Sequence, residues 1–452
     1  MKAINPATGE LIRDYAEHTD AEAAHFVELA QEAFRGWRAT SFEHRAALMK
    51  RAATEQRKNK QQYAEIMTRE MGKTITESAA EVEKCAWVCD YYADNAARFL
   101  VDEPIQTDAS RSFVTFEPLG VVLAVMPWNF PFWQVMRFAA PALMAGNAGV
   151  LKHASNVPGS ALALEEIFRR AGFPENIFRT LIIGSRQVEK IIRHPLVKAV
   201  TLTGSEPAGI QVASIAGSEL KKTVLELGGS DPYIVLEDAD LPKCVLTSAT
   251  ARMINQGQSC IAAKRFIVVE PLVQEFEKQQ TAIMRSLKMG DPMLPDTKVG
   301  PMARLDLLEE LDDQVQRSIR AGARLLCGGR RADGPGAFYL PTVLAGVRKG
   351  MSVYEEETFG PVSAIIPVKD TEEAIAVAND SRFGLGGSVW SRDLAKAEMV
   401  ARRVETGAMF VNGMTKSDPR LPFGGVKKSG YGRELSHYGI KEFVNIKTIW
   451  IA

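Results

Sequence analysis

The spacing of apolar residues changes near residue 118. Before that point, segments 43–70 and 76–99 carry apolar residues three and four positions apart with charged residues between them, which is typical of helices with one buried face. After it, short apolar runs alternate with amphipathic stretches of about ten residues. Strands that alternate with helices of this length imply βαβ units and therefore a parallel sheet.

The alternation is interrupted at Gly228-Gly229 and then resumes, which predicts two successive α/β blocks. Before the interruption, the expected strands are 121–125, 149–151, 177–183, 199–202 and 224–225, and the expected helices are 159–170, 187–193 and 207–216. After it, the expected strands are 232–236, 265–269, 362–367, 387–390 and 408–411, and the expected helices are 241–255, 273–287, 305–321, 371–379 and 394–404. We therefore expect an α/β protein with two parallel-sheet domains, the first formed by 1–100 and 119–228 and the second by 229–430.

Two further segments, 111–117 and 443–451, alternate apolar and polar residues but have no helical partner. They could pair as a small outlying sheet. An exposed edge of such a sheet favours association between subunits. We therefore assign 101–118 and 431–452 to oligomerisation and expect a homo-oligomer.

Composition and charge favour a globular protein that acts on a small molecule. Lys+Arg and Asp+Glu both number 55, so no excess charge would draw the chain to nucleic acid or an anionic membrane. The most apolar stretch, 120–126, is too short to span a bilayer, and the N-terminus lacks the pattern of a signal peptide. Five cysteines in 452 residues form no disulfide framework, which fits a reducing cytoplasm. Cys85 and Cys89 lie at helical spacing without a further Cys or His at zinc spacing, so no metal site is expected.

Two local features suggest covalent catalysis. Cys260 follows Gly257 at the end of an expected helix, where a thiol can be approached closely and act as a nucleophile. An inert buried thiol is the alternative. Glu226 ends an apolar strand before two glycines, and burial there would raise its pKa and suit a general base. A structural ion pair is the alternative for Glu226.

Two further features suggest binding of an oxyanion and a phosphate. Asn129 lies between Pro127 and Pro131, where a fixed amide could donate to an oxyanion, although asparagine is also common in turns. Thr203-Gly204-Ser205 follows a strand and opens a helix, whose N-terminal N–H groups could bind a phosphate. An ordinary N-capping serine would look similar.

Taken in order and spacing, these features resemble the aldehyde dehydrogenase superfamily from Ile4 to the C-terminus. The resemblance lies in residues 4–9, 127–131, 146–152, 203–205, 226–229, 257–260, 357–361 and 422–425. Residues 133–137, 152–154 and 427–430 look most like the bacterial succinate-semialdehyde dehydrogenase group.

The resemblance implies that NAD or NADP oxidises an aldehyde to a carboxylate. Cys260 would attack the carbonyl, Asn129 would stabilise the oxyanion, and Glu226 would activate water to hydrolyse the thioester. It also implies a cofactor site made of Trp128, Lys152, Ser155, Gly204, Ser205, Leu227, Glu357 and Phe359. NAD-preferring relatives often carry Glu at the position of Ser155, so a neutral hydroxyl here should tolerate NADP.

Substrate recognition is implied at Arg137, Trp133, Ser417 and Phe423. Arg137 matches an arginine that binds the far carboxylate of succinate semialdehyde, and an arginine in an apolar tunnel is costly without an anionic partner. An ion pair within the protein is the alternative for Arg137. A second arginine of better-known relatives is here Ile254, so carboxylate recognition is incomplete by that pattern.

Three alternatives stay open at this point. A CoA-acylating relative would generally lack the base at Glu226. A dehydrogenase for an uncharged or amino aldehyde is kept open by Ile254, although Arg137 argues against a cationic substrate. A non-enzymatic protein on the same fold is opposed by the intact Cys260, Glu226 and Asn129. Members of the superfamily form dimers or tetramers, and the tail 443–451 is compatible with either.

Overall fold

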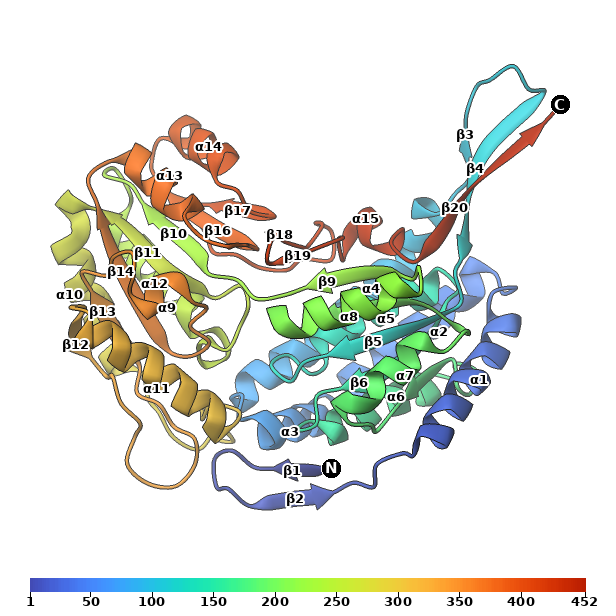
Figure 1. Ribbon diagram of the computed structural model, residues 1–452, viewed down its shortest axis with the longest axis horizontal. Coiled ribbons are helices and arrows are strands. Elements are labelled where there is room, and N and C mark those ends of the chain that lie inside the picture. The colour runs from blue at the N-terminus through green and yellow to red at the C-terminus, as the bar shows by residue number, and fades with distance from the viewer.

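The computed structural model describes all 452 residues and has two lobes and a projecting arm. Each lobe is built on one large sheet, and the chain passes between the lobes near residue 228 (Figure 1). The α/β prediction is confirmed. None of the helices combines the length and apolar character needed to cross a membrane.

The six-stranded sheet of the first lobe has the order β19-β9-β8-β5-β6-β7. Its strands are β5 (Val121–Met126), β6 (Ala148–His153), β7 (Phe178–Thr180), β8 (Val197–Thr203), β9 (Lys222–Glu226) and β19 (Gly430–Tyr431). The chain runs outward from β5 to β7 and then returns to place β8 on the other side of β5, with all of these pairings parallel. Such a reversal of strand order opens a crevice at the carboxyl ends of the two central strands, which is where ligands bind in open α/β sheets.

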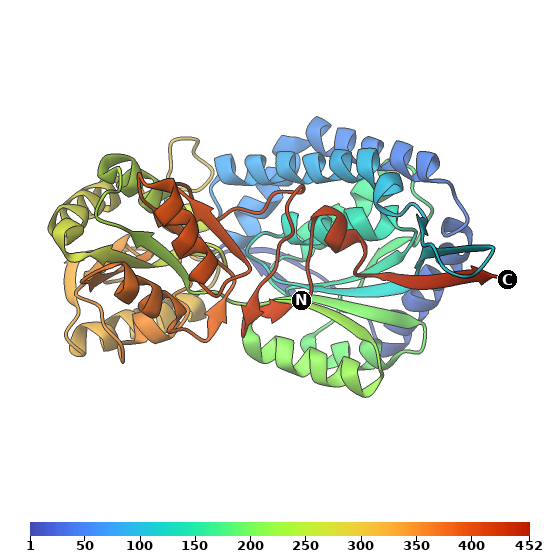
Figure 2. The same cartoon turned by 90° about the horizontal axis from the view of Figure 1, so that it is seen from above.

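Helices cover both faces of this sheet. They are α1 (Asp20–Trp37), α2 (Phe42–Lys58), α3 (Lys60–Met71), α4 (Ile75–Phe99), α5 (Trp133–Met144), α6 (Pro158–Arg170), α7 (Val188–Arg193) and α8 (Glu206–Ser218). Figure 2 shows the blue helices α2, α3 and α4 along one face and α8 on the other. Every residue of α5 is buried, because this helix packs under α2 and α4. The polar side chains that α5 carries are therefore held inside the protein.

The seven-stranded sheet of the second lobe has the order β12-β13-β14-β11-β10-β16-β17 and is parallel except at β12. Its strands are β10 (Asp231–Val235), β11 (Ala263–Val269), β12 (Arg324–Cys327), β13 (Thr342–Ala345), β14 (Val362–Val368), β16 (Gly386–Trp390) and β17 (Ala408–Val411). Its helices are α9 (Leu241–Met253), α10 (Glu270–Ser286), α11 (Leu305–Arg320), α12 (Ser352–Glu355), α13 (Thr371–Asn379) and α14 (Leu394–Arg403).

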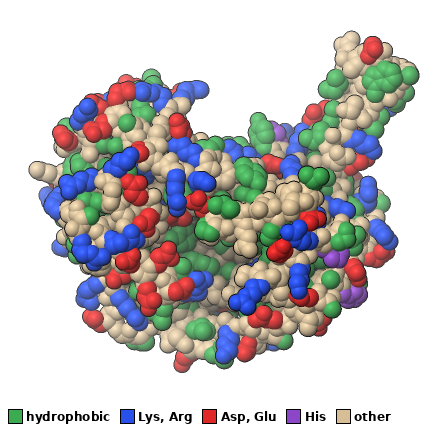
Figure 3. Space-filling model, viewed as in Figure 1, with side chains coloured by type: hydrophobic (Ala, Val, Ile, Leu, Met, Phe, Trp, Pro, Cys, Tyr) green, Lys and Arg blue, Asp and Glu red, His purple; other side chains and the backbone are tan.

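The arm is a three-stranded antiparallel sheet of β3 (Glu103–Pro104), β4 (Arg111–Pro118) and β20 (Val444–Ile451). β20 pairs with β4 from Val444 opposite Pro118 to Ile451 opposite Arg111. The predicted pairing of the two alternating segments is therefore confirmed. Figure 3 shows hydrophobic side chains on the surface of this arm, where Trp450 is 52% exposed.

Several predicted elements have different bounds. The expected helix 43–70 is interrupted at Asn59, whose backbone is not helical, and forms α2 and α3. The expected strand 177–183 is reduced to β7, because the carbonyl of Ile182 accepts a hydrogen bond from the N–H of His18 in the N-terminal segment. The expected helix 241–255 ends at Met253. The strands β12 and β13 and the small pairs β1 (Lys2–Ile4) with β2 (Leu11–Asp14) and β15 (Phe383–Gly384) with β18 (Val426–Lys427) were not predicted.

Candidate active site

A cleft of about 650 Å³ opens where the strand order of the first sheet reverses, and both lobes contribute to its walls. Eight of the residues singled out from the sequence line it: Trp128, Asn129, Gly204, Ser205, Leu227, Cys260, Glu357 and Phe359. Trp128 and Asn129 follow β5, and Gly204 and Ser205 follow β8. The fold therefore brings residues more than two hundred positions apart into one space.

The loop before Cys260 has a left-handed backbone. After α9, Asn255 has φ 51°, Gln256 has φ 53° and Gly257 has φ 76°, a conformation that non-glycine residues rarely adopt. A Cβ at Gly257 would lie 2.1 Å from the carbonyl oxygen of Gly360, so only glycine fits there. The turn is held because the carboxylate of Glu77 accepts the N–H of Asn255 at 2.8 Å. Strain of this kind persists at functional sites when the surroundings over-determine it.

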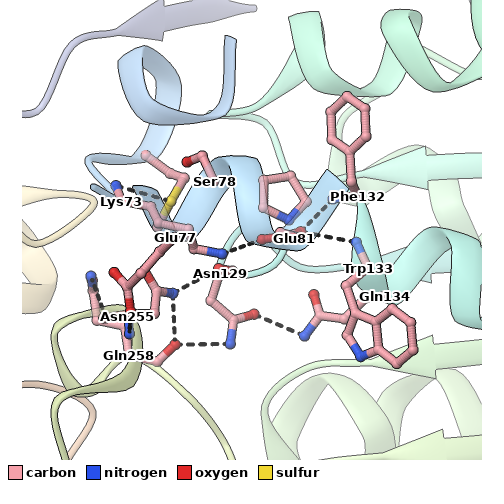
Figure 4. A network of polar contacts seen from close by, with 12 residues as sticks. Lys73, Glu77, Ser78, Glu81, Asn129, Phe132, Trp133, Gln134, Asn255 and Gln258 are labelled. Carbon is pink, nitrogen blue, oxygen red and sulfur yellow. Dashed lines mark hydrogen bonds and ion pairs between the residues drawn. The ribbon is translucent and has the colours of Figure 1, made fainter. Parts of the chain in front are cut away.

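The amide of Asn129 is fixed by partners from both lobes. Its Nδ2 donates to the carbonyl of Gln258 at 3.0 Å, and its Oδ1 accepts from Nε2 of Gln134 at 3.0 Å. Nδ2 of Asn255 donates to the carbonyl of Asn129 at 2.7 Å and to that of Gln258 at 3.1 Å (Figure 4). These bonds orient one N–H of Asn129 and leave the second for another acceptor. The donor is preorganised, as an oxyanion site requires.

The N-terminus of α5 is anchored by a buried ion pair. One oxygen of Glu81 accepts the N–H groups of Phe132 and Trp133, each at 2.9 Å, and the other pairs with Lys73 (Figure 4). A carboxylate satisfies the free N–H groups at a helix start and is favoured by the helix dipole. The position of Gln134, and through it Asn129, therefore depends on α4.

Burial raises the pKa of the Cys260 thiol to about 12. The positive charges of Arg137 and Lys264 oppose this effect, while Glu357 and Glu226 add to it. Lys264 is completely buried, donates to the carbonyl of Cys260 at 2.8 Å and lies 3.4 Å from a carboxylate oxygen of Glu357. Cys260 is therefore mostly a thiol at neutral pH, and its thiolate gains from any further positive charge in the cleft.

Glu226 lies at the end of β9, buried, and neither carboxylate oxygen has a hydrogen-bond partner. Burial and the nearby Glu434 raise its pKa well above the usual range, against the opposing charges of Arg137 and Arg433. A Cβ at Gly424 would lie 2.7 Å from Oε1, so glycine at that position makes room for the carboxylate. No ion pair within 4.0 Å occupies Glu226, which leaves both oxygens free to accept a proton.

The two glycines after Glu226 leave room for the side chain of Glu357. The N–H of Gly229 donates to its Oε1 at 3.0 Å, and a Cβ at Gly228 would lie 2.2 Å from its Oε2. Phe359 lies edge-on to Trp128, with ring centroids 5.8 Å apart. The Gly228-Gly229 pair is therefore a point of close approach between the two lobes.

Arg137 lies in α5 outside the lining of the cleft and already has partners within the protein. It forms an ion pair with Glu434, donates to Oγ1 of Thr203 at 3.3 Å, and its guanidinium lies 4.6 Å from the ring centroid of Phe423. The charge of Arg137 is thus balanced by Glu434. A substrate carboxylate is not needed to account for its burial, and its role in substrate binding stays a prediction.

A second hollow, lined by Ser155, Asn156 and Arg304 among others, continues from the cleft along α11. Leu305 and Asp306 of that helix line this hollow, and later residues of the same helix line the cleft. Lys152, three residues before Ser155, lies outside the lining of both hollows; it is half-buried, and burial alone lowers its pKa, with no charged group contributing. The two hollows share α11 as a wall, and the helix start after Ser205 lines the cleft, an arrangement that suits an extended anionic ligand.

Trp133 and Ser417 lie outside the lining of the cleft, and both contact Lys84. Sequence reasoning missed Lys84, together with Lys264, Gln134, Asn255 and Glu434. Lys264 and Arg265 carried a signal, since two adjacent charges open the apolar strand β11 and buried charges need partners. Lys84 and Glu434 carried none, because their partners come from distant parts of the chain.

Fold, groove and catalytic residues together define a cofactor-dependent enzyme of the aldehyde dehydrogenase class. Residues 1–449 match the model of the aldehyde dehydrogenase family, and the chain belongs to this family. It is 53% identical, over all of both chains, to a Synechocystis sp. protein named "probable succinate-semialdehyde dehydrogenase" with NADP(+). It is 51% identical, again over all of both chains, to the NADP(+) succinate-semialdehyde dehydrogenase 1 of Mycobacterium tuberculosis.

Solved structures show the same fold. Succinic semialdehyde dehydrogenase from Streptococcus pyogenes, in complex with NADP+, superimposes with a TM-score of 0.98 at 42% identity, over all of this chain and 99% of that one. Betaine aldehyde dehydrogenase from Staphylococcus aureus superimposes with a TM-score of 0.96 at 30% identity, over 99% of this chain and 91% of that one. Since relatives named for different aldehydes share one backbone, the substrate depends on individual side chains.

Proposed function

We propose that this chain is an NADP-dependent succinate-semialdehyde dehydrogenase. The observation that carries the proposal is the single cleft in which Cys260, the fixed amide of Asn129 and the groove for an extended anion meet. The relatives at 51–53% identity support both the cofactor and the substrate.

The proposed chemistry runs through Cys260. Its thiolate adds to the aldehyde carbonyl, and the free N–H of Asn129 stabilises the oxyanion, a contribution of about 3–4 kcal/mol for one such donor. Glu357 and Phe359 would hold an oxidised nicotinamide, which would supply the hydride acceptor needed to convert the adduct on Cys260 to a thioester. Glu226 takes a proton from water as the water attacks the thioester, and the carboxylate product leaves. The raised pKa of Glu226 suits a group that must take up a proton in this step.

The preference for NADP rests on the charges around Ser155 and Lys152. No carboxylate lies within 4.0 Å of Lys152, and Ser155 is neutral and exposed. A 2′-phosphate would compensate the lysine, whereas a carboxylate at this place would repel it. We assign the pyrophosphate to the helix start after Ser205, whose side chain makes no capping bond. Trp128, Gly204, Leu227, Glu357 and Phe359 would line the remainder of the cofactor site.

One second candidate is supported by a specific observation. Because Glu434 already balances Arg137, the residue expected to bind a substrate carboxylate is engaged within the protein. This arrangement favours an uncharged aliphatic aldehyde unless another cation receives the carboxylate. The family relationship is the same for both candidates.

The deciding experiment compares kcat/KM for succinate semialdehyde with that for butanal, each with NADP and with NAD. Each tenfold preference corresponds to about 1.4 kcal/mol in the transition state. A preference of at least about a hundredfold for the acid aldehyde is expected, together with a preference for NADP. Equal rates for the two aldehydes would retain the enzyme class and eliminate succinate semialdehyde as its substrate.

We also propose that the chain forms a homodimer or homotetramer through the arm. The exposed apolar residues of β20, among them Ile446 at 62% and Trp450 at 52%, support this, because an isolated apolar edge is a pairing site. Light scattering should therefore give a mass that is a multiple of 49.6 kDa. The five unpaired cysteines support a reducing compartment such as the cytoplasm.

A further inference from the structure

The helix α4 presents three charged residues to the active site at successive turns. Glu77 receives the N–H of Asn255 in the nucleophile loop, and Glu81 receives the N–H groups at the start of α5 (Figure 4). Lys84 follows at the next helical spacing on the same face. The first two residues hold parts of the site in place, so the face that carries Lys84 is directed inward.

The ammonium of Lys84 has polar and aromatic contacts but no carboxylate in direct contact, and the charges of Glu81 and Asp418 oppose the lowering of its pKa only from further away. Its Nζ donates to Oγ of Ser417 at 2.7 Å and lies 4.1 Å from the ring centroid of Trp133. No carboxylate lies within 4.0 Å of it, whereas Lys73 and Lys264 pair with Glu81 and Glu357. Burial and the charge of Arg137 lower the pKa of Lys84 to about 8. A desolvated cation in this position is costly without an anion.

A second donor at the same place lacks an acceptor. Trp133 is only 3% exposed, and its buried Nε1 has no hydrogen-bond partner. Buried indole N–H groups usually find a partner. The ammonium of Lys84, this indole N–H and the hydroxyl of Ser417 therefore form a set of donors, in which the indole N–H lacks an acceptor and the ammonium lacks a paired carboxylate. A carboxylate meets both needs, since it accepts several hydrogen bonds and carries the opposite charge.

The donor set lies next to the reacting end of the cleft. Trp133 directly precedes Gln134, whose amide orients Asn129. Arg137, one turn further along α5, is bound to Glu434. Lys84, Trp133 and Ser417 lie outside the lining of the cleft, whereas Gln134, the neighbour of Trp133, lines it.

We infer that Lys84, with Trp133 and Ser417, binds the far carboxylate of the aldehyde substrate and so determines its specificity. This inference rests on the proposed function, because it names the receptor for a carboxylate that only an acid aldehyde carries. It also supplies the cation that the second candidate function lacks. Arg137 then acts on the reacting end, where its charge favours the thiolate of Cys260.

The test measures kcat and KM for succinate semialdehyde and butanal in the wild type, Lys84→Met and Lys84→Arg. Lys84→Met keeps the length of the side chain and removes the charge. We expect the ratio of the two kcat/KM values, acid aldehyde over butanal, to fall about 10- to 100-fold, chiefly through KM, as for loss of charged hydrogen bonds. Lys84→Arg should recover part of the ratio. Lys50→Met, which removes an exposed lysine of α2 paired with Asp94, is the matched control and should leave the ratio at its wild-type value.

Two further measurements keep the outcome clear. Trp133→Phe removes the indole N–H while keeping an aromatic ring, and should lower the same ratio severalfold. Inhibition by succinate, competitive with the aldehyde, should weaken in Lys84→Met in parallel with the KM effect. If the wild type itself shows no preference for the acid aldehyde, the proposed function fails. If the wild type shows the preference and Lys84→Met retains it, the proposed function stands and the assignment of Lys84 is overturned.

Discussion

The reacting end and the far end of the site differ in whether their charged side chains are paired. Around Cys260, both cations have an opposite neighbour: Arg137 pairs with Glu434, and Lys264 lies beside Glu357. Around Trp133 and Ser417, the ammonium of Lys84 has no carboxylate in direct contact, and Glu81 and Asp418 act on it only from further away. A region whose charged side chains are already paired needs no substrate to stabilise it. A region with an unpaired charge is stabilised mainly when a substrate of opposite charge binds. We expect this difference to separate the residues that carry out the reaction from those that select the aldehyde.

Replacing Cys260 by serine should have the largest effect and should be confined to the reacting end. We expect kcat to fall at least about 10⁴-fold, as for loss of other catalytic nucleophiles. Binding of NADP and of succinate, followed by calorimetry, should persist because the far end is untouched. Turnover that survived the substitution would remove Cys260 as the nucleophile.

Glu226→Gln should separate the two chemical steps. The buried amide cannot take up a proton, so the thioester should form and then hydrolyse about 10²- to 10⁴-fold more slowly. Stopped-flow absorbance should show one burst of reduced cofactor per active site and then a slow phase. Steady cycling at the wild-type rate would make Glu226 a structural residue.

Arg137→Met should lower the free energy of unfolding, because it breaks a buried ion pair. Loss of one partner leaves Glu434 buried and unpaired, which typically destabilises a protein by about 3–5 kcal/mol. Urea unfolding should show this loss, and Arg137→Met combined with Glu434→Gln should recover most of it. Lys84→Met should not destabilise the protein, because it removes a cation that has no partner. Equal destabilisation by the two single substitutions would show that the ends do not differ.

The reaction of Cys260 with iodoacetamide should depend steeply on pH. With a thiol pKa near 12, the thiolate fraction rises about tenfold per pH unit, so labelling should accelerate about 100-fold from pH 7 to pH 9. A thiol of ordinary pKa would instead level off near pH 9. Peptide mapping distinguishes Cys260 from the partly exposed Cys327. A plateau at pH 8–9 would mean that Arg137 and Lys264 outweigh burial.

Ser417→Ala should have the smallest effect and should fall on the far end. It removes one neutral hydrogen bond to Lys84, worth about 1 kcal/mol, so KM for succinate semialdehyde should rise about fivefold. The KM for butanal measures whether the change is local. Equal increases for both aldehydes would place Ser417 outside carboxylate recognition.

Much of the architecture followed from local patterns in the sequence. The alternation of short apolar runs with amphipathic helices predicted the α/β fold, and the alternating segments predicted the pairing of β4 with β20. Residues at chain turns, such as Asn129, Ser205 and Cys260, stood out because glycine and proline mark places where side chains are presented. Bounds were less accurate where tertiary contacts prevail, as at Ile182, whose carbonyl bonds to His18.

The sequence by itself determined which covalent chemistry is available to the protein. A thiol, an amide and a carboxylate near the ends of predicted strands and helices can be recognised from the local sequence alone. Only the tertiary structure decided which charges are balanced. Arg137 looked like a free cation in an apolar helix, yet Glu434, almost three hundred residues away, neutralises it. Lys84 looked like one more solvated charge on an amphipathic helix, yet the fold buries it without a counter-ion against Trp133 and Ser417. The strength of a charge depends on burial and on neighbours, and both come from parts of the chain that meet only on folding.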